Sequence, residues 1–332
     1  MTFHFGIICV IEKVTARAFA NIALVKYWGK QPGFNNVPAT PSISLALKSL
    51  KTITEVERIR SGKDSFFLNG SIVSKVIYRR LVEYLDFWRN NKLIDGKFII
   101  RSHNNFPTGA GLASSSSGFA ALTVALSAFS RRKIGKHQLS RFARRGSGSA
   151  ARSIVGGLSA LPIGADPAAR LLLSGDEVPW GMVVIEVEGR TKKIGSREGM
   201  ELCRRYSPYY RQWITLANKD YRKMLSALRR LDFSRVGEVA EANALAMHAC
   251  MFASRPALVY WSPATIEIIN SVWQWRVDGL ETYFTIDAGS NVVLLCKQED
   301  LKEAIRRASR LKNVRSAIKS LPGGPAEIIE LS

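Results

Sequence analysis

The chain of 332 residues lacks paired cysteines and long apolar runs, and each absence excludes a class of protein. Its four cysteines, Cys9, Cys203, Cys250 and Cys296, are far apart in the sequence, which argues against a zinc site and favours free thiols in a reducing cytosol. No apolar run reaches the length of a membrane span. The apolar start, 3–11, has neither a basic leader nor a small-residue cleavage site, so we expect no signal peptide. Its sequence fits an added first strand or an extension ahead of the fold.

Acidic residues are also scarce. The chain has 48 Lys and Arg against 27 Asp and Glu, which gives a net charge of +21. Such a surplus is typical of proteins that bind nucleic acids or anionic surfaces. The basic residues are nevertheless spread over separate predicted helices, with no arginine-rich tail and no recognised nucleic-acid motif. We therefore expect no specific nucleic-acid partner and no membrane partner, and we attribute part of the surplus to polyphosphate ligands.

Hydrophobic periodicity predicts a mixed α+β protein with mostly antiparallel strands. Strands are expected at 14–27 (or a hairpin there), 42–50, 52–56, 98–101 and 183–187, with a strand pair at 282–286 and 292–296. Helices are expected at 76–88, 115–129, 137–144, 208–231, 236–253, 265–277 and 301–311, with a short one ending at 156–157. A change in pattern near Gly181 predicts two parts, 1–180 and 181–332, that share one cleft.

The stretch 104–117 predicts a phosphate-binding loop. Pro107, Gly109 and Gly111 favour an irregular loop, and the serines at 114–117 then lead into an apolar helix. A helix start presents unpaired N–H groups and a partial positive charge, which together attract phosphate. The loop is not of the Walker type, because no Gly-Lys-Ser/Thr closes it. A serine cap on an ordinary core helix is the alternative interpretation.

Three further segments, 20–30, 144–153 and 286–291, stand in a fixed order around this loop. With these four segments the chain resembles the diphosphomevalonate decarboxylases of the GHMP kinase superfamily, from about Val14 to Pro325. The serine loop indicates only the superfamily. The Lys-Tyr-Trp-Gly-Lys run at 26–30 and the Gly-Ser-Gly-Ser-Ala-x-Arg run at 146–152 are typical of the decarboxylases.

The resemblance implies the GHMP kinase fold, with an N-terminal ribosomal-S5-like half and a C-terminal ferredoxin-like half. It implies ATP and Mg²⁺ as cofactors, a cytoplasmic homodimer, and ATP-dependent decarboxylation of mevalonate 5-diphosphate to isopentenyl diphosphate. The residues implied to bind the nucleotide are Pro107, Gly109, Gly111, Leu112, Ala113, Ser114, Ser115, Ser116, Lys192 and Lys193, with Ser115 also nearest the metal.

Other functions stay open at this point. One is the same chemistry on mevalonate 5-phosphate or another 3-hydroxy acid, and another is a mevalonate 3-kinase that does not decarboxylate. A basic nucleic-acid-binding module on the same fold is a third. Asp287 and Lys26, which related kinases can lose, are both present and favour decarboxylation.

Asp287 is the predicted catalytic base, because it follows an apolar strand and can project from the strand end into a cleft. Taken alone, this position favours an Asp in a β-turn, and the order of the other three segments is what favours a catalytic base. The resemblance implies that Asp287 orients or deprotonates the substrate 3-hydroxyl, that Arg152 holds the carboxylate that leaves as CO₂, and that Asn21 aims Arg152. Ser147 and Ser149 are implied to lie near the phosphates, although both could simply cap a helix.

Residues 26–30 predict a phosphate-binding and water-excluding wall. Lys26 and Lys30 would neutralise phosphoryl groups, while Tyr27 and Trp28 would exclude water. If this segment continues the strand, Lys26, Trp28 and Lys30 lie on one face and Tyr27 on the other, unless Gly29 bends the chain.

The segment 195–200 resembles a substrate-binding loop of the family. Its Ser196 and Arg197 are implied to meet the substrate diphosphate, with Lys192 and Lys193 assisting from just before the loop. Gly195 stands where the family has a further serine. A charged, solvated turn is the alternative.

Two departures from the family pattern concern the substrate more than the fold. Thr40 stands where the family usually has Asn, and Ser290 replaces a proline. His248 lies in an apolar helical context and is predicted to be a core histidine with satisfied hydrogen bonds.

Overall fold

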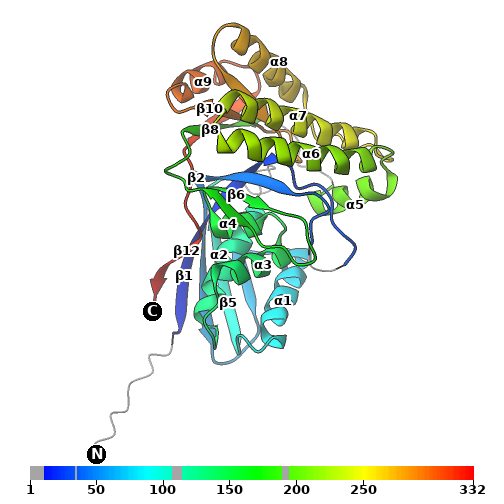
Figure 1. Cartoon of the computed structure of the whole chain (residues 1–332). Helices are drawn as coiled ribbons and strands as arrows, with labels where there is room; N and C mark the ends of the chain where they lie inside the picture. The colour runs from blue at the N-terminus through cyan, green and yellow to red at the C-terminus, as the bar shows by residue number, and fades with distance from the viewer. Residues whose placement is uncertain (1–10, 34–35, 107–113, 189–193) are drawn as a thin grey trace, which may run out of the picture.

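The computed structural model describes residues 11–33, 36–106, 114–188 and 194–332. Within these residues two sheets are covered by helices (Figure 1). The larger sheet has the order β12 (Glu327–Leu331), β1 (Lys13–Val25), β2 (Ser42–Ile59), β5 (Lys97–Asn104), β3 (Ser65–Leu68) and β4 (Ser71–Ile72), with β6 (Leu158–Leu161) paired to β2 and β7 (Arg170–Leu173) paired to β6. The smaller sheet has the order β11 (Val314–Ser320), β8 (Trp180–Val187), β10 (Val292–Lys297) and β9 (Thr282–Thr285).

The helices divide between these sheets (Figure 1). Those in the first part of the chain are α1 (Lys75–Asn90), α2 (Ser114–Ala128), α3 (Lys136–Gly146) and α4 (Ala150–Val155). The later ones are α5 (Ser196–Tyr206), α6 (Tyr210–Arg229), α7 (Phe233–Phe252), α8 (Pro263–Val277) and α9 (Leu301–Ala308). Among the described strands only β3 and β5 pair in parallel, so the expected α+β class with mostly antiparallel pairing is confirmed.

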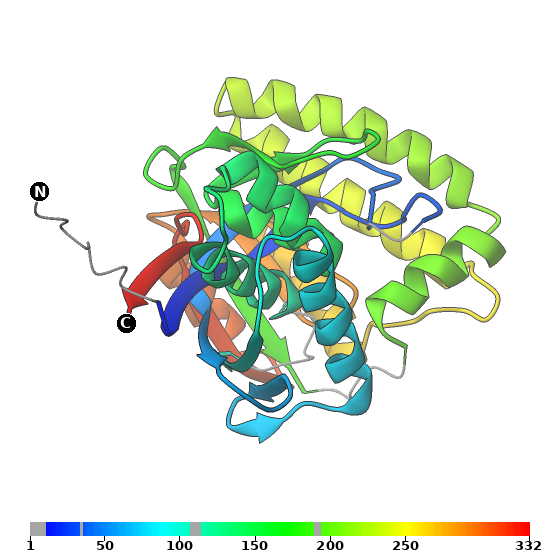
Figure 2. The ribbon, with the colours of Figure 1, turned by 90° about the horizontal axis from the view of Figure 1, so that it is seen from below.

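The helices and strands with the most apolar sequences lie in the interior of the molecule. Helix α2 is apolar around nearly its whole circumference, and it packs on β1, β2 and α4 in the middle of the first part. Every residue of β8 is buried, because this strand lies between β11 and β10 and is covered by helices. Seen from below, α6 runs along the upper edge of the view and α7 lies alongside it (Figure 2).

Three segments differ in form from the expectation, and strands β3, β4, β6, β7, β11 and β12 were not expected. The segments 42–50 and 52–56 form one long strand, β2, because β1 pairs along most of it. Residues 14–27 form no hairpin, and the single strand β1 ends at Val25. Residues 196–206 form helix α5 rather than a loop; its N-cap, Gly195, provides no side-chain hydrogen bond that would mark a helix start in the sequence.

The last strand, β12, lies next to the first one. Its residues pair antiparallel with β1, so the C-terminus returns to the larger sheet (Figure 1). All five β12 residues are exposed, and its short mixed sequence Glu-Ile-Ile-Glu-Leu has no clear period, which is why the sequence did not predict it.

One hydrophobic cluster joins the two sheets. It contains Leu24 of β1, Leu45 of β2, Trp180 of β8, Met224 of α6 and Val236 of α7. The two parts of the molecule therefore pack on each other through a common core.

Cys203, Cys250 and Cys296 are buried free thiols, as predicted, and Cys9 lies outside the described residues. Within the described ranges, no helix combines the length and the apolar character needed to cross a membrane.

Candidate active site

A cavity of about 510 Å³ collects residues from distant parts of the chain. Its walls come from the end of β1 and the segment after it, the starts of α2 and α5, the turn before α4, helices α1 and α7, and the segment after β9. The described lining contains five cations, Lys26, Lys30, Arg80, Arg152 and Arg197, and one carboxylate, Asp287. Such a balance suits a polyanionic ligand.

The described residues that the sequence proposed for the site line this cavity, with the exception of Ser116, which is fully buried and is not part of the lining. The lining residues are Asn21, Lys26, Tyr27, Trp28, Lys30, Ser114, Ser115, Ser147, Ser149, Arg152, Ser196, Arg197 and Asp287. The predictions for Pro107, Gly109, Gly111, Leu112, Ala113, Lys192 and Lys193 lie outside the described residues.

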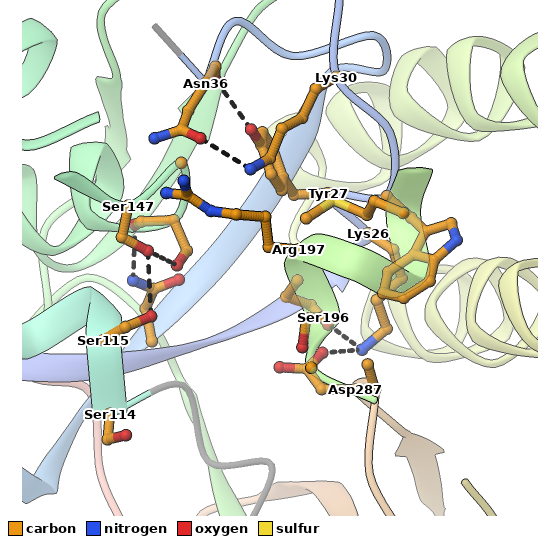
Figure 3. Close-up of a pocket in the computed structure, with 18 of the residues that line it drawn as sticks. Lys26, Tyr27, Lys30, Asn36, Ser114, Ser115, Ser147, Ser196, Arg197 and Asp287 are labelled. Atoms are coloured by element: carbon orange, nitrogen blue, oxygen red, sulfur yellow. Dashed lines mark hydrogen bonds and ion pairs between the residues drawn. The ribbon is translucent and has the colours of Figure 1, made fainter. Parts of the chain in front are cut away.

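An ion pair between Lys26 and Asp287 forms one wall (Figure 3). The Lys26 Nζ atom lies 2.6 Å from Asp287 Oδ1 and also donates to the Ala23 carbonyl at 2.9 Å. The Lys26 side chain is 1% exposed and that of Asp287 is 24% exposed, so the carboxylate is the member that can reach a ligand. Burial lowers the pKa of Lys26 from its usual value, and Asp287 partly opposes this shift.

Arg152 is held by a buried polar network. Its Nε donates to Ser44 Oγ at 2.7 Å, its Nη1 donates to Ser42 Oγ, and its Nη2 donates to Asn21 Oδ1 at 3.2 Å. Asn21 in turn donates to Ser153 Oγ at 2.8 Å. A guanidinium has five N–H donors, so donors remain for a ligand. Burial lowers the pKa of Arg152 to about 10, which leaves it charged at neutral pH.

Serine hydroxyls line the opposite side in the view of Figure 3. Ser114 and Ser115 begin helix α2, and Ser115 Oγ lies 3.1 Å from Ser147 Oγ. The chain continues to Ser149, whose Oγ is 3.3 Å from that of Ser147. These hydroxyls, together with the backbone N–H groups of the helix start, can bind phosphate oxygens.

Lys30 and Tyr27 are tied to the same residue, Asn36 (Figure 3). The Lys30 Nζ donates to Asn36 Oδ1 at 2.7 Å, and Tyr27 Oη donates to the Asn36 carbonyl at 2.8 Å. Asn36 Nδ2 donates to the carbonyls of Arg144 and Arg145. The sequence analysis did not select Asn36, because a lone Asn beside a loop carries no motif.

The two-faced strand expected at 26–30 is wrong. Because β1 ends at Val25, the chain from Lys26 to Gly29 is irregular, and Tyr27 lines the cavity together with Lys26, Trp28 and Lys30. Gly29 has φ +124°, and a Cβ there would collide with the Tyr210 hydroxyl.

Arg80 is a further site residue that the sequence analysis missed. It lies on α1, stacks 4.6 Å from the Phe119 ring centroid and donates to the Gly146 carbonyl. Burial, with the charge of Arg197, lowers the pKa of Arg80 to about 10. Arg80 is one of several basic residues of α1, and no local signal in the sequence distinguishes it from a solvated arginine.

The cations around Lys30 repel one another. Burial lowers the pKa of Lys30 to about 7, and the charges of Arg197 and Arg80 contribute to the shift. Arg197 is at the first turn of α5, next to Ser196. An anionic ligand at this point would relieve the repulsion.

A second cavity, of about 160 Å³, adjoins the first. It shares Ile77, Arg80, Ser114 and Ser115 with the larger cavity, and its other walls are mostly apolar. Its lining also includes Phe66, Val73, Leu81, Ile100, Phe119 and Leu122, with polar groups from Thr52, Ser102 and Asn104. A flat apolar group with a few polar edges fits such a lining.

His248, Thr40 and Ser290 are not among the described residues that line the cavity. His248 is in the core, as predicted, and its ring packs against Trp261 beside the backbone of Ile286 and Asp287. Burial lowers its pKa to about 3, so it is neutral. Thr40 is fully buried and donates to the Lys26 carbonyl at 3.3 Å, outside the cavity lining. The carbonyl of Ser290 accepts from Thr265 Oγ1 at 2.7 Å.

Two family models match consecutive parts of the chain. The diphosphomevalonate decarboxylase-like N-terminal domain matches residues 18–170, and the mevalonate 5-diphosphate decarboxylase C-terminal domain matches residues 182–326. Among curated relatives, the diphosphomevalonate decarboxylase of Danio rerio is 32% identical, covering 96% of this chain and 86% of the relative. That of Schizosaccharomyces pombe is also 32% identical, covering 87% and 80%.

Solved structures agree with these matches. Mevalonate diphosphate decarboxylase from Staphylococcus aureus superposes with a TM-score of 0.90 at 36% identity, covering 96% of this chain and 98% of that one. The complex of MDDEF with MVAPP, AMPPCP and magnesium also has a TM-score of 0.90, at 34% identity and with 96% and 99% coverage. The GHMP kinase fold implied by the resemblance is thereby confirmed.

Proposed function

The chain belongs to the diphosphomevalonate decarboxylase family, and from this premise we propose that its larger cavity carries out ATP-dependent decarboxylation of mevalonate 5-diphosphate. The products are isopentenyl diphosphate, ADP, phosphate and CO₂. The observation that carries the proposal is the convergence of Asp287, Arg152 and a group of cations on one cavity. A base, a carboxylate ligand and phosphate ligands are the three parts that this reaction needs.

Asp287 is the proposed base for the first step. Its carboxylate takes the proton of the 3-hydroxyl while the hydroxyl oxygen bonds to the γ-phosphorus of ATP and ADP leaves. Lys26, at 2.6 Å, keeps this carboxylate oriented before the proton arrives. The ammonium can also stabilise negative charge on the transferring phosphoryl group.

Arg152 is the proposed ligand of the substrate carboxylate. Its position is set by Asn21, Ser42 and Ser44, so the remaining donors point in a fixed direction. In the second step the C3–O bond breaks and phosphate leaves with the electron pair. The bond from C2 to the carboxyl carbon then breaks, its electrons form the alkene, and CO₂ departs.

The start of α2 is the proposed phosphate site for ATP. Ser114, Ser115 and Arg80 border both cavities, so a nucleotide can extend its phosphates into the larger one and its base into the smaller, apolar one. The Ser115 hydroxyl would hold Mg²⁺, which neutralises charge on the nucleotide phosphates. Ser147, 3.1 Å away, can add a hydrogen bond to the same phosphates.

Lys30 and Arg197 are the proposed ligands of the substrate diphosphate. Both are in the lining, and their mutual repulsion in the free protein favours an anion between them. Tyr27 and Trp28 cover this end of the cavity with aromatic surface. Ser149 and Ser196 supply neutral donors nearby.

We also infer a division near Gly181 and a cytoplasmic homodimer. The two family matches, 18–170 and 182–326, support the division.

Free buried thiols support a location in the reducing cytoplasm. Exposed apolar side chains on one face of α8, Ile266, Trp273 and Val277, offer a surface for a second copy. Light scattering after size exclusion tests the dimer, and fractionation of cells tests the compartment.

Product analysis tests the proposed function. Purified protein with ATP and Mg²⁺ is given mevalonate 5-diphosphate or mevalonate 5-phosphate, and ADP, phosphate and CO₂ are measured. We expect the three products in equal amounts with the diphosphate. ADP without CO₂ would identify a 3-kinase, and a preference for the monophosphate would overturn the substrate while retaining the chemistry.

A further inference from the structure

Lys26 lies just past the end of β1, where its backbone has no strand partner among the residues that the structure describes. Side chains form hydrogen bonds with this backbone instead. The Lys26 N–H donates to Asn243 Oδ1 of α7 at 2.8 Å, and its carbonyl accepts from Thr40 Oγ1 at 3.3 Å. Asn243 and Thr40 are both fully buried. The backbone that carries Lys26 is thus held from two sides by groups that do not line the cavity.

Asn243 is itself oriented by a buried carboxylate. Its Nδ2 donates to Asp220 Oδ2 of α6 at 3.0 Å, and Asp220 is 7% exposed. An ionised carboxylate can only accept, so it selects the amide orientation that turns NH₂ toward α6 and the oxygen toward Lys26. The reverse orientation would direct NH₂ at the Lys26 N–H, and both groups would lose their acceptor.

We propose that Asp220 and Asn243 are positioning residues that act through the backbone of Lys26 to hold its ammonium against Asp287. This inference rests on the proposed function, because it assigns the relay to the Lys26–Asp287 pair. Helices α6 and α7 pack against each other and against the end of β1, so the relay runs from the outer helix to the reacting group. Neither Asp220 nor Asn243 is among the described residues that line the cavity.

The test is the isosteric variant Asp220→Asn in the full chain. An amide at position 220 can donate as well as accept, so Asn243 loses its preferred orientation. We expect kcat to fall about tenfold, the worth of one well-formed buried hydrogen bond, with KM for ATP and for the acid within about threefold of wild type. Asp278→Asn is the matched control, because exposed Asp278 also accepts from a side-chain amide, that of Gln274, at 2.9 Å.

The double variant Asp220→Asn/Asn243→Asp provides the rescue. The amide introduced at position 220 would then donate to the carboxylate introduced at position 243, whose second oxygen accepts from the Lys26 N–H. We expect its kcat to return to within about threefold of wild type. A purely structural role would instead lower thermal stability and change kcat and KM together in the single variant.

Three results would overturn the inference. They are an Asp220→Asn kcat equal to that of the control, a parallel loss of stability that accounts for the lost activity, and a double variant no better than the single one. If Asp287→Asn still abolishes turnover in any of these cases, only the positioning role fails. If Asp287→Asn is fully active, the proposed mechanism fails independently of the relay.

Discussion

Asp287 carries two tasks at the residue scale. It is the proposed base, and it is also the counter-charge of a lysine that is almost completely buried. Replacing it therefore removes the proton acceptor and leaves the Lys26 ammonium without its partner. A buried, uncompensated charge is costly, so in such a variant Lys26 is expected to become neutral.

The first prediction is that Asp287→Asn lowers kcat by about a hundredfold or more, since general base catalysis contributes on that scale. Nucleotide binding should stay near normal, because the proposed contact of Asp287 is with the reacting hydroxyl. Single-turnover phosphate release and titration with an ATP analogue measure the two properties. A variant with more than a tenth of the wild-type kcat would remove Asp287 from the mechanism.

The second prediction concerns the outer phosphate of the substrate. Arg197→Ala should raise KM for mevalonate 5-diphosphate about tenfold to a hundredfold, as expected for a lost charge-assisted contact of about 1.5–3 kcal/mol. The effect on the monophosphate should be smaller. Steady-state kinetics with both acids make the comparison, and Arg211→Ala, on the exposed side of α6, is a control. Equal losses on both acids would contradict this role.

The third prediction follows from the lowered pKa of Lys30, about 7 in the free protein. Above that pH the free Lys30 is neutral, and a bound diphosphate raises its pKa, so binding takes up a proton. KM for the diphosphate should rise between about pH 7.5 and 9, where the ligand itself is fully ionised. Lys30→Arg, which stays charged, should flatten the profile. A wild-type KM constant across this range would contradict the prediction.

At the scale of elements, the first turn of α8 supports the segment after Asp287. Ser262 and Thr265 form a capping box at the helix start, with Pro263 in the first turn. The Thr265 hydroxyl also donates to the Ser290 carbonyl at 2.7 Å. A local capping signal in the sequence therefore contributes to a contact near the catalytic residue.

The fourth prediction is that Ser262→Ala lowers the free energy of unfolding by about 1 kcal/mol, the usual worth of an N-cap. The Thr265 contact with Ser290 remains, so kcat should change less than about twofold. Urea denaturation measures the stability. The control is Ser271→Ala on the same helix, whose hydroxyl only bonds back to the Glu267 carbonyl and should matter little.

At the scale of the whole molecule, two features matter: how the positive charge is distributed and how the two parts share one hydrophobic core. The described residues of the cavity lining account for a formal net charge of +4, five cations minus one carboxylate, of the +21 of the chain. The remainder is distributed over the rest of the chain. The core is shared, because one cluster contains side chains from both sheets and from α6 and α7.

The fifth prediction is that the chain unfolds in a single cooperative transition, although two family models divide it. Neither part can lose its fold without exposing the common cluster. Scanning calorimetry should give one peak whose van't Hoff and calorimetric enthalpies agree. Two separable peaks would show that the shared core contributes little to cooperativity.

The sequence by itself determined the class of fold and most residues of the cavity. Periodicity predicted the main helices and the β9–β10 pair, because burial of one face imposes its period locally. Short motifs identified Lys26, Arg152, Asp287 and the serines of α2, because each lies beside recognisable neighbours in the chain. Edge strands such as β12 were missed, since exposed residues carry no such period.

Only the tertiary structure decided which of these residues meet. Lys26 and Asp287 are 261 positions apart, and their contact depends on packing between the ends of β1 and β9. Arg80, Asn36 and the Asp220–Asn243 relay belong to the same arrangement, yet each looks like an ordinary polar residue in the sequence. The local pattern of apolar and polar residues indicates which face of a helix or strand is buried. Contacts between polar groups that are distant in the sequence follow instead from how the helices and strands pack.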